Sequence, residues 1–239
     1  MIRAIAFDLH DTLVYRDRDS LAAAHLGAAE YLRNQGFDVT YEDFVAAHRR
    51  NSARIVRDLH SQNREVSFDD WSEGLLRELG IRSQRRDLGR GIIEAYGEKT
   101  AGLTHLYPGV KEMLTVLKKR FKLGLVSNSL AEGTKQDLKA LSIGDYFDAV
   151  VISSDHGVRK PNPSIFLITI ELLGVQAGEA LFVGDNVKED VFGAKEVGMK
   201  TVLVTGGLPV DQTAEPDYTV AKVTDILTLP PLSVIQPRN

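Results

Sequence analysis

Short apolar runs alternate with helical patterns over most of the chain. The run at 4–7, Ala-Ile-Ala-Phe, is apolar at every position, which is typical of a strand buried on both faces of a parallel sheet. Similar runs predict strands at 123–126, 149–152, 180–183, 201–204 and 218–220, and helical apolar spacing predicts helices at 110–121, 131–141, 163–173 and 187–197. Repeated strand–helix units of this kind predict a doubly wound parallel sheet.

Residues 16–102 have a different pattern, with no convincing strand and four helical segments. Thr40 is followed three residues later by Asp43, and Ser67 by Asp70, which are start signals related to the capping box. Glycines follow the first and third segments, where helices commonly end. Four helices of this length form a small bundle, and they are expected at 20–35, 40–60, 67–80 and from Ser83 onward.

The two patterns together predict an α/β protein with an inserted domain. The Rossmann-like core would comprise residues 1–15 and 103–239, and a four-helix cap would comprise residues 16–102. The insert leaves directly after the strand at 4–7, and ligands of open α/β sheets bind outside the carboxyl ends of the strands. The cap is therefore expected to hang over the ligand site as a lid.

Composition narrows the class of protein. The 239-residue chain is 43% hydrophobic with a formal net charge of −4, so it can bury a large core and has no global basic footprint for nucleic acid. It has no cysteine, which excludes disulfides and thiolate metal sites. No apolar stretch approaches the ~18 residues of a membrane span, and no signal-peptide layout begins the chain. We expect a cytoplasmic protein, monomeric or homodimeric, without a membrane or nucleic-acid partner.

Polar side chains stand at the ends of four expected strands, where parallel strands bring them together. Carboxylate oxygens suit a hard cation such as Mg²⁺, and lysine and serine side chains can hold phosphate oxygens. An aspartate kept ionised beside a metal and a lysine can act as a nucleophile. The four clusters are Asp8 with His10 and Thr12, Ser127 with Asn128, Asp155 with Arg159 and Lys160, and Asp185 with Asn186 and Asp190.

These clusters resemble motifs of the haloacid dehalogenase superfamily, in the subgroup with a helical cap inserted after the first strand. The matching segments are Phe-Asp-Leu-His-Asp-Thr-Leu-Val at 7–14, Val-Ser-Asn-Ser at 126–129, Val-Arg-Lys-Pro-Asn-Pro-Ser-Ile-Phe at 158–166 and Val-Gly-Asp-Asn-Val-Lys-Glu-Asp at 183–190. One such motif would be weak evidence for the family, whereas four motifs in the same order, each at the end of an expected strand, are specific evidence. The resemblance covers essentially the whole chain.

The resemblance implies a role for each motif. Asp8 would be the nucleophile, Ser127 would contact phosphate, and Lys160 would steady the nucleophile and the phosphoryl group. Asp185 would be a metal ligand, Asp190 would support the water shell of the metal, and Mg²⁺ is the implied cofactor.

The same motifs imply roles for neighbouring residues. Thr12 and Asn128 are expected at the phosphate, and Asn186 is expected to support the metal site beside Asp190. Asp8 and the backbone carbonyl of His10 would complete the metal ligands with Asp185, because the family uses the carbonyl at that position.

His10 departs from the pattern of the family. Its phosphatases carry an aspartate two residues after the nucleophile, which protonates the leaving oxygen and then deprotonates the attacking water. Asp11 resembles an ordinary variant at its own position and does not replace that carboxylate. Histidine is a capable acid and base near neutral pH, so His10 either takes over proton transfer or leaves a slow enzyme.

The residues favour a Mg²⁺-dependent phosphomonoesterase that acts on a small phosphorylated substrate through an aspartyl-phosphate on Asp8. One alternative is a 2-haloacid dehalogenase, in which Asp8 attacks carbon without a metal, since those relatives also lack an aspartate two positions later. A second alternative is a binding or regulatory protein that kept the fold and lost turnover, which only His10 favours.

Some residues outside the motifs also have a predicted place. Tyr15 and Arg16 lie between core and cap and are candidates for substrate contact, whereas His25 is not expected to face the site. Four other histidines show no metal-ligand spacing and are expected to be structural or exposed: His48, His60, His105 and His156.

Overall fold

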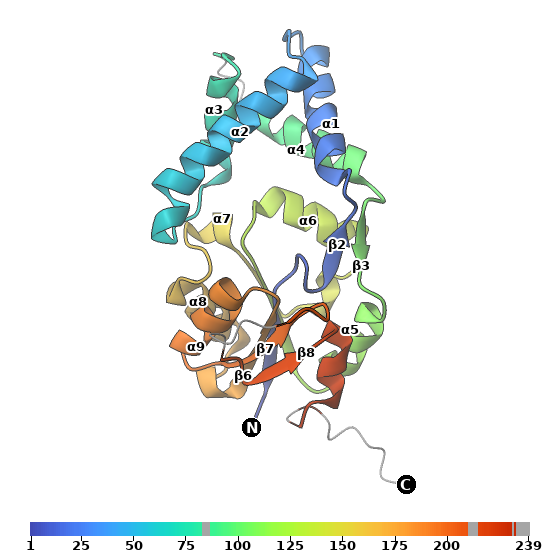
Figure 1. Ribbon diagram of the computed structural model, residues 1–239, viewed down its shortest axis with the longest axis vertical. Helices are drawn as coiled ribbons and strands as arrows, with labels where there is room; N and C mark the ends of the chain where they lie inside the picture. Colours follow the sequence, from blue (N-terminus) through green and yellow to red (C-terminus); the bar gives the residue numbers. More distant parts are fainter. Residues whose placement is uncertain (83–86, 210–214, 231, 233–239) are drawn as a thin grey trace.

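Six parallel strands form the central sheet of the protein, which is described by a computed structural model covering residues 1–82, 87–209, 215–230 and 232 (Figure 1). The strand order is β5-β4-β1-β6-β7-β8, so β1 lies inside the sheet between β4 and β6. The doubly wound parallel sheet predicted from the sequence is thereby confirmed. Its strands are β1 (Ala4–Phe7), β4 (Lys122–Ser127), β5 (Ala149–Ile152), β6 (Ala180–Gly184), β7 (Lys200–Val204) and β8 (Tyr218–Val220).

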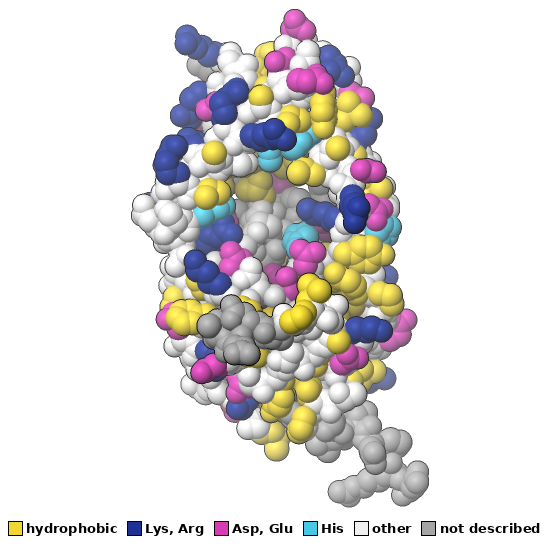
Figure 2. Space-filling model, in the orientation of Figure 1, with side chains coloured by type: hydrophobic (Ala, Val, Ile, Leu, Met, Phe, Trp, Pro, Cys, Tyr) yellow, Lys and Arg dark blue, Asp and Glu magenta, His cyan; other side chains and the backbone are white. Residues whose placement is uncertain are grey.

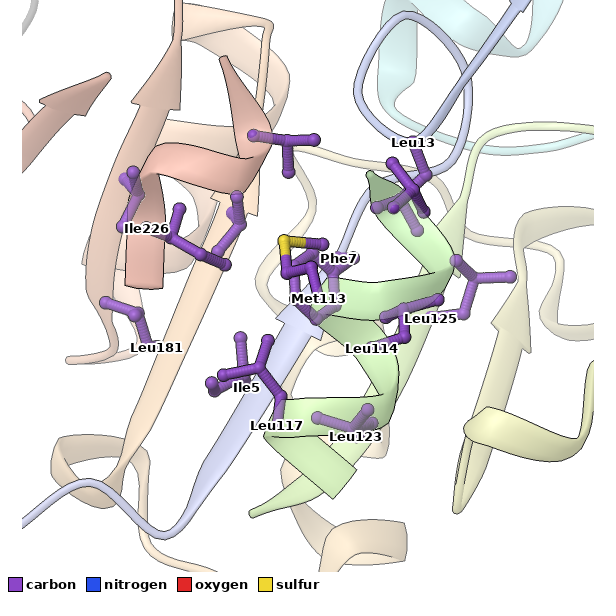
Figure 3. Packing of buried hydrophobic residues seen from close by; sticks show 14 of the residues in the cluster. Ile5, Phe7, Leu13, Met113, Leu114, Leu117, Leu123, Leu125, Leu181 and Ile226 are labelled. Atoms are coloured by element: carbon purple, nitrogen blue, oxygen red, sulfur yellow. The ribbon is translucent and has the colours of Figure 1, made fainter. Parts of the chain in front are cut away.

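Successive side chains of a strand point to opposite faces of the sheet, so apolar strands present two faces that must be covered. Helices cover both faces of this sheet. Ile5 and Phe7 of β1 pack toward α5 (Val110–Lys118) and η5 (Val223–Thr228), as Figure 3 shows. Alanines 4 and 6 face the other side, where α8 (Pro163–Leu173) and α9 (Gly193–Glu196) lie. The remaining elements of the core are α6 (Ala131–Ala140), η2 (Gly144–Tyr146), α7 (Ser153–His156), η3 (Ala177–Glu179) and the π-helix η4 (Val187–Phe192).

Four longer helices pack around a separate hydrophobic core above the sheet (Figure 1). The capping box at Thr40 is present: the Asp43 N–H donates to the Thr40 hydroxyl at 3.0 Å, and the Thr40 N–H donates to the Asp43 carboxylate at 3.1 Å. Ser83, where the fourth helix is expected to start, lies outside the described residues. The helices are α1 (Ser20–Asn34), α2 (Tyr41–Asp58), α3 (Phe68–Glu78) and α4 (Asp87–Thr100), with the short η1 (His60–Gln62) after α2.

An antiparallel strand pair connects these helices, here called the cap, to the core. β2 (Val14–Arg16) pairs with β3 (Thr104–Leu106) and forms the hinge. The sequence pattern does not predict this pair, because each strand has three residues and no apolar alternation. The domain boundaries predicted at 15/16 and 102/103 fall at the hinge and stay a prediction.

The cap contacts the core at a second place, opposite the hinge. The Glu65 N–H donates to the Gly157 carbonyl at 3.0 Å, and the Arg159 N–H donates to the Asn63 carbonyl at 3.2 Å. The Glu65 carboxylate is 6% exposed and accepts a hydrogen bond from Ser153 Oγ at 2.9 Å. Between the two contacts the surface is hollowed, with acidic, basic and histidine side chains around the hollow (Figure 2).

The helix expected at 187–197 is divided into η4 and α9, and the short α7 was not predicted. In the part of the chain that the structure describes, no helix has both the length and the apolar character needed to cross a bilayer.

Candidate active site

A buried ammonium group joins two carboxylates at the carboxyl edge of the sheet. Asp8 follows β1 directly, and Lys160 Nζ donates to Asp8 Oδ1 at 2.5 Å and to Asp190 Oδ1 at 2.7 Å. The Lys160 side chain is 2% exposed, and its Nζ lies 5.5 Å from the centre of the Phe182 ring. The ammonium is therefore held within hydrogen-bond distance of the expected nucleophile.

The burial of several charges together shifts their pKa values. Burial raises the pKa of Asp8 to about 6; the charge of Lys160 opposes this rise, and that of Asp190 adds to it. Burial and the charge of Asp190 also raise the pKa of Asp185. Burial alone would lower the pKa of Lys160, but Asp190 and Asp8 outweigh it and hold that pKa above its usual value. Three carboxylates beside one ammonium leave an excess of negative charge.

The three carboxylates have the chemistry of a cation site. Asp8, Asp185 and Asp190 each offer one oxygen, and these atoms lie within 4.8 Å of one another. Gly184 places Asp185 at the end of β6, and a side chain at Gly184 would collide with the Asp190 carboxylate. Oxygen donors with excess negative charge fit a hard divalent cation such as Mg²⁺.

The residues expected at the phosphate lie beside this group. Ser127 ends β4, and its hydroxyl accepts a hydrogen bond from Ser129 Oγ at 3.0 Å. Thr12 Oγ1 donates to Asp185 Oδ1 at 3.2 Å. The side chain of Asn128 donates to the Lys160 carbonyl at 3.0 Å and accepts from the Lys160 N–H at 2.8 Å. Asn128 thus fixes the backbone that carries Lys160.

Two residues of the predicted clusters are placed differently. The Asn186 side chain accepts from the Lys188 and Glu189 N–H groups, both at 3.0 Å, and so caps the start of η4; only its backbone N–H reaches Asp190 Oδ2, at 2.9 Å. Asp155 is exposed in α7 and pairs with Lys135 at 3.4 Å, so the fold does not bring it to the site.

The His10 side chain has a carboxylate neighbour in α6. Its Nε2 is 3.6 Å from Asp137 Oδ2, and Arg16 Nη2 donates to the same oxygen at 2.6 Å. Asp137 lies in α6, and the sequence does not predict it as a site residue, because a polar residue on a half-exposed helix carries no local signal of function. Asp11 is exposed with a φ of 59°, which short polar residues tolerate in a tight turn.

The remaining candidates have contacts within the hinge or the cap. Tyr15 packs against His105 and Tyr107, with ring centres 5.2 and 5.1 Å apart. His25 is buried in the cap, and its ring centre lies 4.6 Å from that of His48.

Comparisons with known proteins agree with the family resemblance of the four motifs that form this site. A family model described as haloacid dehalogenase-like hydrolase matches residues 2–198. The chain is 33% identical over 204 residues to glyceraldehyde 3-phosphate phosphatase of Pyrococcus abyssi, covering 84% of this chain and 81% of that protein. It is 31% identical over 229 residues to phosphoglycolate phosphatase of Aquifex aeolicus, covering 95% and 96%. A solved HAD phosphatase from Thermococcus onnurineus superposes with a TM-score of 0.66 at 27% identity, covering 95% of this chain and 97% of that one.

Proposed function

The chain belongs to the haloacid dehalogenase-like hydrolases, and we propose that it is a Mg²⁺-dependent phosphomonoesterase with Asp8 as nucleophile. The observation that carries the proposal is the buried contact of Lys160 with Asp8 and Asp190 beside Asp185. The ammonium of Lys160 beside Asp8, together with a cation that the three carboxylates would hold, would suit the transfer of an anionic group. Two relatives that are 33% and 31% identical are named as phosphatases of small metabolites, which supports a small phosphorylated substrate here.

In the first half-reaction, an oxygen of Asp8 attacks phosphorus while the bond to the leaving oxygen breaks. Lys160 offsets the negative charge on the phosphoryl oxygens, and the Ser127 hydroxyl with the Asn128 backbone N–H orients them. Thr12 donates a hydrogen bond to Asp185 and so orients that carboxylate. The product is an aspartyl-phosphate and a free alcohol.

The donor set fits Mg²⁺ because it is all oxygen and carries excess negative charge. Asp8, Asp185 and the backbone carbonyl of His10 would hold the ion, with Asp190 and the backbone of Asn186 supporting its water shell. When bound, Mg²⁺ supplies Lewis-acid stabilisation of the negative charge on the phosphoryl oxygens. It would also keep Asp8 ionised, although burial raises the pKa of that group to about 6.

His10 moves the protons in this proposal. Protonated His10 donates to the leaving oxygen in the first half-reaction, and neutral His10 accepts a proton from water in the second. Water then attacks phosphorus, the bond between phosphorus and the Asp8 oxygen breaks, and inorganic phosphate leaves.

A panel of phosphorylated metabolites and 2-haloacids, assayed with Mg²⁺ and with a chelator, tests the proposal. We expect phosphate release that the chelator stops and that added Mg²⁺ restores. Halide release from a 2-haloacid in the chelator, with no phosphate release from any ester, would contradict it and favour the dehalogenase alternative.

A further inference from the structure

Glu65 is a cap residue whose carboxylate is buried against the core. It lies between η1 and α3, and only 6% of its side chain is exposed. Its Oε1 accepts a hydrogen bond from the Val66 N–H at 2.9 Å and lies 2.8 Å from His60 Nε2. Its Oε2 accepts a hydrogen bond from Ser153 Oγ at 2.9 Å and lies 3.7 Å from Arg159 Nη1. A buried carboxylate is costly unless donors surround it, so these contacts favour one arrangement of cap and core.

The main chain fixes where this carboxylate sits. The Glu65 N–H donates to the Gly157 carbonyl at 3.0 Å, and the Arg159 N–H donates to the Asn63 carbonyl at 3.2 Å. Both hydrogen bonds join the cap to the core, at the contact opposite the hinge. The carboxylate of Glu65 therefore reaches Ser153 only while the cap is seated on the core.

Ser153 connects Glu65 to the loop that follows β4. Ser153 is fully buried, and its Oγ accepts a hydrogen bond from the Ser129 N–H at 2.9 Å. Its single hydroxyl hydrogen has two acceptors within reach, the Glu65 carboxylate at 2.9 Å and the Ser129 carbonyl at 3.2 Å. Hydrogen bonds to a charged acceptor are the stronger ones, so the hydrogen goes to Glu65. Loss of the carboxylate would turn it toward the Ser129 carbonyl and change how the loop is held.

The Ser129 side chain in turn sets the direction of the Ser127 hydroxyl. Ser129 Oγ donates to Ser127 Oγ at 3.0 Å and lies 2.6 Å from Thr134 Oγ1. A hydroxyl has one hydrogen, so Ser129, which gives its own to Ser127, must accept the hydrogen of Thr134. Within the part of the chain that the structure describes, the hydrogen of Ser127 then has no acceptor, which leaves it for a phosphate oxygen.

We propose that Glu65 is a positioning residue through which the seated cap aligns the Ser127 hydroxyl with phosphate. This inference rests on the proposed function, which places Ser127 at the phosphoryl oxygens. The path runs from Glu65 through Ser153 and Ser129 to Ser127, and each link is a hydrogen bond of 2.9 or 3.0 Å. The phosphate loop is thereby ordered when the cap covers the site, which favours phosphoryl transfer away from bulk water.

The test measures kcat/KM on p-nitrophenyl phosphate with Mg²⁺ in a double-mutant cycle. We expect a ~10-fold fall in Glu65→Ala and a similar fall in Ser153→Ala, which removes one hydroxyl and leaves the main-chain contact of the cap in place. In the background of Ser127→Ala, which is itself slower, neither substitution should lower kcat/KM further, because no hydroxyl is left to align. A merely structural role of Glu65 would not give this dependence on Ser127.

Glu30→Ala is the matched control within the cap. Glu30 pairs with Lys99 at 2.6 Å, both side chains are exposed, and neither has a hydrogen bond to the path among the described residues. We expect its kcat/KM to equal that of wild type. The melting temperature of each variant shows whether it is folded, and Ser153→Ala decides the test alone if Glu65→Ala does not fold.

The contrary results can be told apart. Losses in the Ser127→Ala background as large as those in the wild-type background would overturn the inference, because Glu65 would then only hold the cap in place. Wild-type kcat/KM in both single variants would overturn it as well, with the proposed function left standing. If wild type hydrolyses no phosphate ester, the proposed function fails, and the inference fails with it.

Discussion

Two ionic groups lie among the residues of the candidate site and its surroundings, and they are built differently. In the first, here called the inner group, Lys160 joins Asp8 and Asp190 at 2.5 and 2.7 Å, and all three side chains are at most 10% exposed. In the second, the outer group, Asp137 lies 2.6 Å from Arg16 and 3.6 Å from His10. Its histidine is 29% exposed and its arginine 47% exposed.

The two groups suit different roles in the reaction. Short contacts in a water-poor place keep charges fixed, which favours stabilisation of the charge that moves during phosphoryl transfer. A looser group open to water allows a ring to turn and a proton to be exchanged. The inner group should therefore control whether the reaction occurs, and the outer group how fast protons follow.

The largest effect is expected at the centre of the inner group. Asp8→Asn removes the nucleophile while keeping nearly the same shape, so phosphatase activity should fall at least ~10⁴-fold. Circular dichroism and the melting temperature should show a folded protein. Turnover close to wild type in the pure variant would remove Asp8 from the mechanism.

Lys160→Met should damage both activity and stability. Without the ammonium, Asp8 and Asp190 face each other as uncompensated buried charges, which costs about 3–5 kcal/mol of unfolding free energy when both are ionised. The pKa of Asp8, already raised to about 6, would rise further, so the stability deficit should grow as the pH increases through that range and shrink in acid.

Urea unfolding in chelator at about pH 5 and about pH 8 measures this deficit. Lys118→Met is the control, because Lys118 makes an exposed pair with Asp148 at 2.9 Å, and such pairs contribute at most about 1 kcal/mol. A deficit no larger than that of the control, and independent of pH, would show that the contact of Lys160 is not what balances the two carboxylates.

The inner group could be foreseen from the sequence, whereas the outer group could not. Asp8 and Lys160 are 152 residues apart, but both follow strand-end motifs, and parallel strands bring such ends together. Asp137 follows no strand-end motif. Its contact with His10 depends on how α6 and the hinge are placed in the folded protein, which no local pattern predicts. The Asn128 side chain was expected at the phosphate, yet its hydrogen bonds to the Lys160 backbone are tertiary contacts that no local pattern encodes.

Changes at His10 should have an intermediate effect that depends on the substrate. We expect His10→Ala to lose at least ~10²-fold on an alkyl phosphate and much less on p-nitrophenyl phosphate, because only the first leaving group needs a proton. His10→Asp should retain or improve activity by restoring the residue usual in phosphatases of the family. Equal small losses of His10→Ala on both esters would make His10 a spectator.

The smallest effect is expected in the cap, where His25 is buried and His48 half-buried, and neither has a carboxylate partner among the contacts described. Burial, with the charge of His25 adding to it, lowers the pKa of His48 to about 4. The unfolded chain binds that proton near ~6.5, so the stabilising effect is complete above that pH and is lost as the pH falls toward the folded value.

His48→Gln should therefore reduce the fall in melting temperature between about pH 7.5 and about pH 5 by a few degrees. His156→Gln is the control, because His156 is exposed and should leave the pH dependence unchanged. The same pH dependence in wild type and His48→Gln would show that His48 does not resist protonation in the folded cap.

The central claim, that phosphate is transferred to Asp8, can be tested by trapping the intermediate. His10→Ala is mixed with p-nitrophenyl phosphate and Mg²⁺, quenched in acid during turnover and reduced with borohydride, which converts an acyl phosphate of aspartate to homoserine. Because the first step barely needs a proton and the second does, we predict that peptide mass spectrometry finds homoserine at position 8, at a higher level than in wild type and absent from Asp8→Asn. Continued phosphate release with residue 8 always recovered as aspartate would contradict the account.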